Sequence, residues 1–176
     1  MRRGPSLSGK LVRLRPFTSE DISGAYLGWL NDPLVTRFSN QRFRRHDRTS
    51  SLAYLASFEG TDNLFMSMRR LADDSAIGTM TAYLSRHHGT VDVGIMVGDR
   101  TAWGKGYGQD GWNVMLDWLA GLANIRKITA GTAAPNIGMQ RLMERSGMTL
   151  EARRIGQEII EGKPEDILYY ARFLVR

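Results

Sequence analysis

The stretch from Val91 to Ala120 constrains the fold more than any other part of this sequence, because it joins a strand pattern to a helix pattern through closely spaced glycines. Apolar residues alternate with other residues from Val91 to Val97, which is the period of a strand with two different faces. Apolar side chains then recur every three or four residues from Trp112 to Leu122, the period of an amphipathic helix. A turn without bulky side chains is therefore expected between a strand and a helix.

Glycine occupies every second position from Gly104 to Gly108 in this turn, with a lysine and a tyrosine between. Glycine leaves the backbone N–H groups uncovered, so that a ligand can approach them closely. The start of a helix adds the positive end of the helix dipole, worth roughly 0.3–1 kcal/mol for a nearby negative charge. The pattern predicts a phosphate site made of main-chain amides.

Two common phosphate motifs do not fit this turn. A dinucleotide fold requires G-x-G-x-x-G and an acidic residue about 20 positions later at the end of the next strand. Here the spacing is G-x-G-x-G, and the next acid, Asp117, lies inside the predicted helix. A nucleoside triphosphate loop requires Gly-Lys followed by Ser or Thr, and Lys105 lacks that neighbour. Both classes are disfavoured.

The turn Trp103-Gly-Lys-Gly-Tyr-Gly108 with its flanking strand and helix, the segment from Lys127 to Gly131 and the segment from Asn136 to Gly147 resemble the GNAT superfamily of acetyl-CoA-dependent N-acetyltransferases. The family signature is Q/R-x-x-G-x-G/A, and its glycines match, while Trp103 replaces the usual Gln or Arg. The resemblance covers nearly the whole chain and implies one GNAT-type domain over residues 1–176. The turn Trp29-Leu-Asn-Asp-Pro33 is similar to the branch with ribosomal-protein N-terminal and nucleotide-linked amino-sugar acetyltransferases.

Length and local patterns agree with a single α/β domain, since 176 residues is an ordinary size for one domain. The patterns predict about seven strands and four helices in the order β-α-α-β-β-β-α-β-α-β-β, and the resemblance implies a mixed, mostly antiparallel sheet with helices on both faces. The expected strands are Leu11–Arg15, Leu64–Arg69, Ala76–Ser85, Val91–Val97, Ile125–Thr132, Met148–Ile160 and Ile167–Val175. Helices are expected from Ser19 to Leu30, after Asp47, after the glycine turn and from Asn136 to Ser146.

Composition excludes several other classes of protein. The sequence has no run of 18 apolar residues, no apolar segment typical of a secretion signal and no cysteine, so we expect a cytoplasmic protein without a membrane partner. Three scattered histidines give no metal-ligand set. A formal net charge of +6 is modest for a nucleic-acid-binding protein and favours a small anionic ligand instead.

The resemblance also implies which residues bind the coenzyme. In this family two central strands splay apart and the pantetheine arm lies in the gap, where backbone groups of one strand bind it and one N–H polarises the thioester carbonyl. Asn136 matches a family asparagine whose amide contacts the pantetheine, although an N-cap after Pro135 is the alternative role. Arg141 is one candidate for the adenosine 3′-phosphate. The expected contacts are Ile95, Met96, Val97, Trp103, Gly104, Lys105, Gly106, Tyr107, Gly108, Gln109, Asn136 and Arg141.

Acetyl transfer also requires that the acceptor amine lose a proton, since an alkyl amine has a pKa of about 10.4. Asp92, on the predicted central strand, is the first candidate for a base acting through water, and an exposed or ion-paired aspartate is the alternative. His46 ranks next, ahead of His87 and His88, because of its arginine-rich neighbourhood. Many members of the family have a tyrosine seven residues after the asparagine, where this sequence has Met143. Tyr107 and Tyr83 are substitutes, unless the thiolate leaves unassisted.

The acceptor is less well defined than the coenzyme. Five arginines between Arg37 and Arg48 form either a solvated loop or a clamp for acceptor phosphates. With the turn after Trp29, they favour acetyl transfer by direct attack in a ternary complex onto a nucleotide-linked or phosphorylated amino sugar. A protein N-terminus and an aminoglycoside are further acceptors. A non-catalytic acyl-CoA-binding module is the alternative to an enzyme, and the sequence leaves open whether the chain forms a homodimer.

Overall fold

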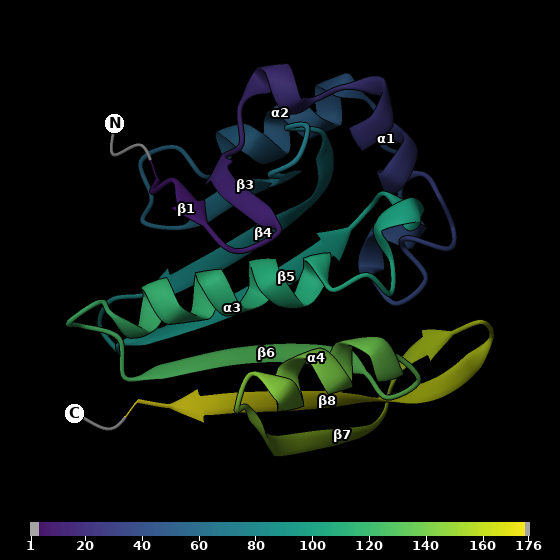
Figure 1. The fold of residues 1–176 in the computed structure, drawn as a ribbon. Coiled ribbons are helices and arrows are strands. Elements are labelled where there is room, and N and C mark those ends of the chain that lie inside the picture. The colour runs from purple at the N-terminus through teal and green to yellow at the C-terminus, as the bar shows by residue number, and fades with distance from the viewer. Residues whose placement is uncertain (1–3, 175–176) are drawn as a thin grey trace.

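One open sheet of eight strands forms the centre of the protein, in the order β1-β2-β3-β4-β5-β6-β8-β7 (Figure 1). The computed structural model describes residues 4–174. Neighbouring strands are antiparallel except β5 and β6, which are parallel, so the expected mixed and mostly antiparallel sheet is confirmed. The strands are β1 (Leu7–Ser8), β2 (Val12–Pro16), β3 (Leu64–Arg70), β4 (Ala76–Ser85), β5 (Thr90–Val97), β6 (Lys127–Ala133), β7 (Thr149–Ile160) and β8 (Lys163–Phe173). The α-helices are α1 (Gly24–Leu30), α2 (Arg48–Ala56), α3 (Tyr107–Ala120) and α4 (Ile137–Arg145).

Helices cover both faces of the sheet, as expected, because alternate residues of each strand face opposite sides. On one face, Trp112 and Met115 of α3 and Met143 of α4 pack with strand residues in the largest core cluster. Figure 1 shows α3 and α4 in front of the sheet. On the other face, α1 and α2 pack on Phe65 of β3 in a separate cluster. The sheet therefore separates two layers that can do different work.

The start of α3 is held against the edge of the sheet by one carboxylate. Asp110, in the first turn of α3, accepts hydrogen bonds from three successive backbone amides, those of Lys10, Leu11 and Val12, at 3.0, 2.8 and 3.0 Å. A side chain at Gly9 would overlap this carboxylate, because a Cβ there would lie 2.3 Å from Asp110 Oδ2. The glycine turn therefore leads into a helix whose start is held in place against the edge of the sheet.

The prediction of a single helix from Ser19 to Leu30 is wrong, because the chain forms two short helices there. A 3₁₀ turn covers Ser19–Asp21, and α1 begins again after Ser23, whose hydroxyl accepts from the amide of Tyr26. Between them Ile22 has ψ 72°, which is not helical. Ser23 is a second N-cap, after Thr18, and it explains the break. Its side chain satisfies an amide that a continuous helix would have bonded internally.

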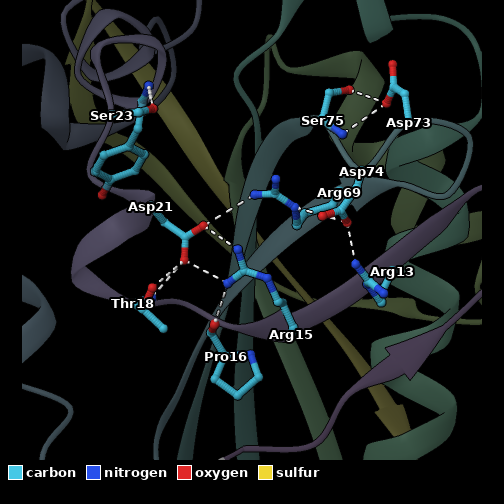
Figure 2. A network of polar contacts seen from close by, with 11 residues as sticks. Arg13, Arg15, Pro16, Thr18, Asp21, Ser23, Arg69, Asp73, Asp74 and Ser75 are labelled. Atoms are coloured by element: carbon cyan, nitrogen blue, oxygen red, sulfur yellow. Dashed lines mark hydrogen bonds and ion pairs between the residues drawn. The ribbon is translucent and has the colours of Figure 1, made fainter.

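Ion pairs join the 3₁₀ turn to the sheet. Asp21 accepts two hydrogen bonds from Arg15 of β2, at 2.7 and 2.8 Å, and lies 3.3 Å from Arg69 of β3 (Figure 2). Arg69 and Arg13 both also pair with Asp74. Burial alone would raise the pKa of Asp21, but hydrogen bonds from Arg15 and Thr18 outweigh burial and hold that pKa below its ordinary value. The carboxylate is therefore charged in the folded protein and orients the chain that leads into α1.

The C-terminal strands form a longer hairpin than expected. β8 begins at Lys163, so a two-residue turn of Glu161 and Gly162 replaces the longer connection expected between Ile160 and Ile167. Both turn residues have positive φ, 51° and 80°, which matches the right-handed twist of a tight hairpin. The short strand β1 is an addition that the sequence did not indicate, and Val175, the expected end of the last strand, lies outside the described residues.

Candidate active site

The sheet splits between its two parallel strands. β5 and β6 pair only through Thr90–Asp92 with Lys127–Thr129, and the residues from Val93 to Val97 have no partner on β6. A cavity of about 730 Å³ lies along this part of β5. Its lining includes Met139 and Leu142 of α4, on one side of the sheet, and the segment 34–39 on the other. The cavity therefore passes through the split and opens toward both layers.

The turn before α3 presents a run of free amides at one side of the split. Gly104 and Gly106 have φ of 69° and 85°, a left-handed conformation that favours glycine. The first amide of this region with an internal partner is that of Asp110, which donates to the carbonyl of Gly106 at 3.0 Å. The six preceding amides, from Gly104 to Gln109, have no hydrogen-bond acceptor among residues 4–174. Six consecutive donors without internal acceptors at a helix start are typical of a site for phosphate oxygens.

Trp103, which replaces the polar residue of the family signature, closes the end of β5. Its indole Nε1 donates a 2.7 Å hydrogen bond to the carbonyl of Val97, and its ring lines the cavity while remaining 44% exposed. Ile95, Met96 and Val97 all line the cavity as expected. The carbonyl of Val97, however, already has a donor, so a ligand in the split meets an indole there.

Asn136 has the N-cap role that was the alternative for this position, and it also lines the cavity. Its Oδ1 accepts from the amide of Met139 at 3.3 Å, which is an N-cap of α4, and the residue also lines the cavity. Its Nδ2 has no acceptor within the described chain, so this group remains available as a donor. Gln109 bonds Asn113 and the carbonyl of Leu142.

Lys105 and Arg141 have exposed side chains and do not line the cavity. They lie on the glycine turn and on α4. The structure therefore brings the main-chain groups of the predicted coenzyme site together and leaves its two cationic side chains at the surface.

Asp92 lies where the split begins, one residue before the part of β5 that lines the cavity. Thr129 of β6 donates a 2.8 Å hydrogen bond to Asp92 Oδ1. Burial raises the pKa of Asp92, and the hydrogen bond from Thr129 opposes this rise. No ion pair with Asp92 occurs in the part of the chain that the structure describes. Asp92 therefore combines a raised pKa with a position at the base of the split.

The other proposed proton-transfer residues lie away from the cavity lining. His46 is held by Asn31, which bonds its backbone, and its Nε2 lies 3.1 Å from the carbonyl of Gln41. Tyr107 begins α3 beneath the guanidinium of Arg70, 5.5 Å from the ring centroid. Met143 is fully buried in the core.

One tyrosine that the sequence did not single out lines the cavity. The hydroxyl of Tyr54, on α2, lies 2.7 Å from that of Tyr83 on β4. Burial and this hydrogen bond raise the pKa of Tyr54, so its hydroxyl stays protonated. No local sequence motif predicts the contact between Tyr54 and Tyr83, because it depends on how α2 packs over β3 and β4. Tyr83 is also the cross-strand neighbour of Asp92 in the β4–β5 register.

The arginine run is neither a simple solvated loop nor a free phosphate clamp. Arg37 donates from Nε and a terminal nitrogen to both oxygens of Glu161, at 2.7 and 3.0 Å. Arg42 donates to the carbonyl of Ile159, and Arg48 donates to the carbonyl of Ile22. Arg37 and Arg42 join the segment Val35–Phe43, which we call the strap, to the β7–β8 hairpin, whereas Arg48 joins α2 to the chain before α1. Within residues 4–174, Arg44 and Arg45 remain without an ion pair.

Comparison with known proteins places this geometry in a family. Residues 12–149 match the model of the acetyltransferase (GNAT) domain, and no curated protein matches the chain. The chain belongs to the GNAT acetyltransferase family, and the expected acetyltransferase is confirmed at this level.

Solved structures with the same fold cover almost the entire chain. RimL, a ribosomal L7/L12 α-N-protein acetyltransferase in complex with coenzyme A, is 13% identical with a TM-score of 0.84, over 97% of this chain and 98% of its own. A GNAT acetyltransferase from Bacillus anthracis is 17% identical with a TM-score of 0.80, over 96% and 98%. Spermidine N-acetyltransferase from Vibrio cholerae, in complex with coenzyme A and spermine, is 17% identical with a TM-score of 0.80, over 93% and 95%. At these identities the likeness concerns the fold.

Two further features concern other classes of ligand. No group of three or more His, Cys, Asp and Glu side chains in the range 4–174 is arranged to hold a metal ion. None of the helices in that range has both the length and the apolar character that a bilayer crossing requires.

Proposed function

We propose that this protein transfers the acetyl group of acetyl-CoA to a primary amine by direct attack within a ternary complex. The observation that carries the proposal is the run of six free amides before α3, placed beside a cavity that passes through the split in the sheet. The diphosphate of coenzyme A fits these donors, because a helix start binds anions through its backbone. The unpaired edge of β5 and the side-chain amide of Asn136 then suit the pantetheine arm.

The chemistry assigned to the residues follows from their positions. An amide of Val93–Val97, the part of β5 without a partner on β6, polarises the thioester carbonyl, which gains negative charge as the amine attacks. Asp92, through water, takes the proton that the ammonium must lose before attack. The C–N bond then forms and the C–S bond breaks. The second proton of the nitrogen passes to the departing thiolate, which has no tyrosine donor at the position of Met143.

Two acceptor classes suggested by the sequence have different support. A nucleotide-linked or phosphorylated amino sugar needs free cations for its phosphates, and in the described chain only Arg44 and Arg45 of the arginine run make no side-chain hydrogen bond or ion pair, although Arg45 acts electrostatically on Asp47. An α-amino group of a protein, the acceptor named for RimL, needs no such cation. The internal use of Arg37 and Arg42 therefore favours an uncharged acceptor body over a phosphorylated one.

Titration calorimetry with coenzyme A, followed by a thiol-release assay with acetyl-CoA and a panel of amines, tests this function. We expect micromolar binding of coenzyme A and release of thiol that depends on an added amine. Binding without thiol release on any amine would instead indicate a non-catalytic acyl-CoA-binding module. Absence of coenzyme A binding would contradict the proposal itself.

A further inference from the structure

The side of the cavity that faces α1 and α2 has an apolar and aromatic wall. It is formed by Leu30 at the end of α1, Leu34 and Phe38 around the strap, Tyr54 of α2 and Phe65 of β3. Phe65 packs against the ring of Tyr54 with centroids 5.2 Å apart. Because the free amides before α3 lie on the opposite side of the sheet, this wall is the surface available to the acceptor.

The charges around this wall are almost all neutralised. Arg37 is the one charged residue among the described residues that line the cavity, and its Nε and one terminal nitrogen donate to the two carboxylate oxygens of Glu161, which balances its charge. Asp32, beside Leu34, lies 3.3 Å from Arg100. A second ammonium group or a phosphate inside the cavity would therefore lose its hydration without gaining a free counter-ion, which is strongly unfavourable.

Asp92 differs from these carboxylates because no arginine or lysine in the range 4–174 pairs with it. Its position at the base of the split provides one negative charge, which can balance one ammonium group of an acceptor. Uncharged polar groups in the cavity lining include the hydroxyls of Thr79 and Thr81 on β4 and of Tyr54, which can bond an amine or a carbonyl without adding charge. The site thus combines one anionic position with an uncharged, apolar wall.

We propose that this wall binds an acceptor with a single ammonium group next to an apolar substituent, and that it rejects polyamines and phosphorylated amines. This inference rests on the proposed function and specifies the substrate class of the same site. A free apolar amine and the N-terminal residue of a peptide with an apolar side chain share this chemistry. The aminoglycoside and the phosphorylated amino sugar suggested by the sequence do not share it.

Binding of matched amines tests the inference without requiring turnover. Hexylamine and 1,6-diaminohexane have the same carbon chain and differ by one ammonium group. We expect calorimetry to show hexylamine bound at least about 10-fold more tightly, both with and without coenzyme A, because the second ammonium lacks a partner. Leucinamide and a pentapeptide with N-terminal leucine then distinguish the two sources, since preference for the peptide indicates a protein N-terminus.

Gln41→Glu provides a charge-only change in the cavity lining, and Gln41→Met is its uncharged control. We expect the Gln41→Glu variant to reduce the preference for hexylamine about 10-fold or more, while the Gln41→Met variant retains it. The inference is overturned if the wild type binds the diamine as tightly as hexylamine, binds neither amine, or keeps its preference in the Gln41→Glu variant. These outcomes differ from failure of the proposed function, which appears as loss of coenzyme A binding or of thiol release.

Discussion

The two ends of the cavity are built from different parts of the chain. At the α3 end, main-chain amides of six consecutive residues form the site, and side chains such as Lys105 point to solvent. At the opposite end, the wall consists of side chains from segments far apart in the sequence, and the strap is attached through the contact between Arg37 and Glu161. The first end depends on backbone conformation and the second on side-chain identity.

This difference predicts which substitutions each end tolerates. A site made of amides survives changes of exposed side chains but not of the glycines whose φ it requires. A site made of side chains changes its preference when a single charge or volume changes. Coenzyme affinity and acceptor preference should therefore respond to separate sets of substitutions, and each prediction below can break that separation.

The largest effect is expected for Gly106→Asp. This change places a carboxylate at the free amides and a side chain on a residue with φ 85°. We expect coenzyme A affinity to fall at least about 10³-fold in calorimetry, since the added charge repels the phosphates. Gly60→Asp is the matched control, because Gly60 has φ 70° in an exposed loop. Retained micromolar affinity in the Gly106→Asp variant would refute the amide site.

Asp21→Asn tests whether the acceptor layer depends on its ion pairs. The substitution leaves Arg15 and Arg69 without their buried partner, and we expect the free energy of unfolding to fall by about 2–3 kcal/mol in urea titrations. Because the pKa of Asp21 lies below its ordinary value, its contribution is present near neutral pH and is lost as pH falls through that lowered pKa. The exposed pair of Asp62 with Arg86 provides the control, Asp62→Asn, for which a smaller loss is expected. Equal losses in the two variants would contradict this role.

Asp92→Asn tests the carboxylate at the base of the split. We expect kcat to fall about 10²-fold with little change in coenzyme A affinity, because the amine loses its proton acceptor. As the pKa of Asp92 is raised, activity of the wild type should decline with falling pH above the usual range of an aspartate. Stopped assays across pH measure both effects, and an unchanged pH–rate profile in the variant would exclude Asp92 as the base.

Arg37→Ala is expected to have the smallest effect and to act only on the acceptor. Loss of the contact with Glu161 frees the strap, so kcat/KM for the amine should fall about 10-fold while coenzyme A affinity stays constant. Both side chains are largely exposed, so little change in Tm is expected. Glu161→Gln should reproduce the effect. A parallel fall in coenzyme A affinity would show that the two ends are not separate.

Much of the fold and the coenzyme end could be predicted from the sequence because their signals are local. The glycine spacing, the helix period from Trp112 to Leu119 and the alternation along β5 all involve neighbouring residues, and the structure confirms each pattern. The break at Ile22 was missed because a second cap at Ser23 competes with the first.

The acceptor end could not be predicted because its contacts are distant in sequence. Arg37 meets Glu161 across 124 positions, and Tyr54 meets Tyr83 across 29. No residue near Arg37 in the sequence indicates that its guanidinium forms an ion pair with Glu161. The arginine run therefore left a solvated loop and a phosphate clamp as alternatives, whereas in the structure three of its members make contacts that hold the chain together.

The short pairing of β5 with β6 has a consequence for how the protein unfolds. Three residue pairs are the backbone joint between a five-strand block and a three-strand block. Whatever occupies the split adds contacts to both blocks at once, so it couples their melting in the way that a bound ligand stabilises the state it prefers. The cooperativity of unfolding measured by calorimetry is therefore expected to depend on the ligand. Without a ligand in the split, the two blocks should melt more independently.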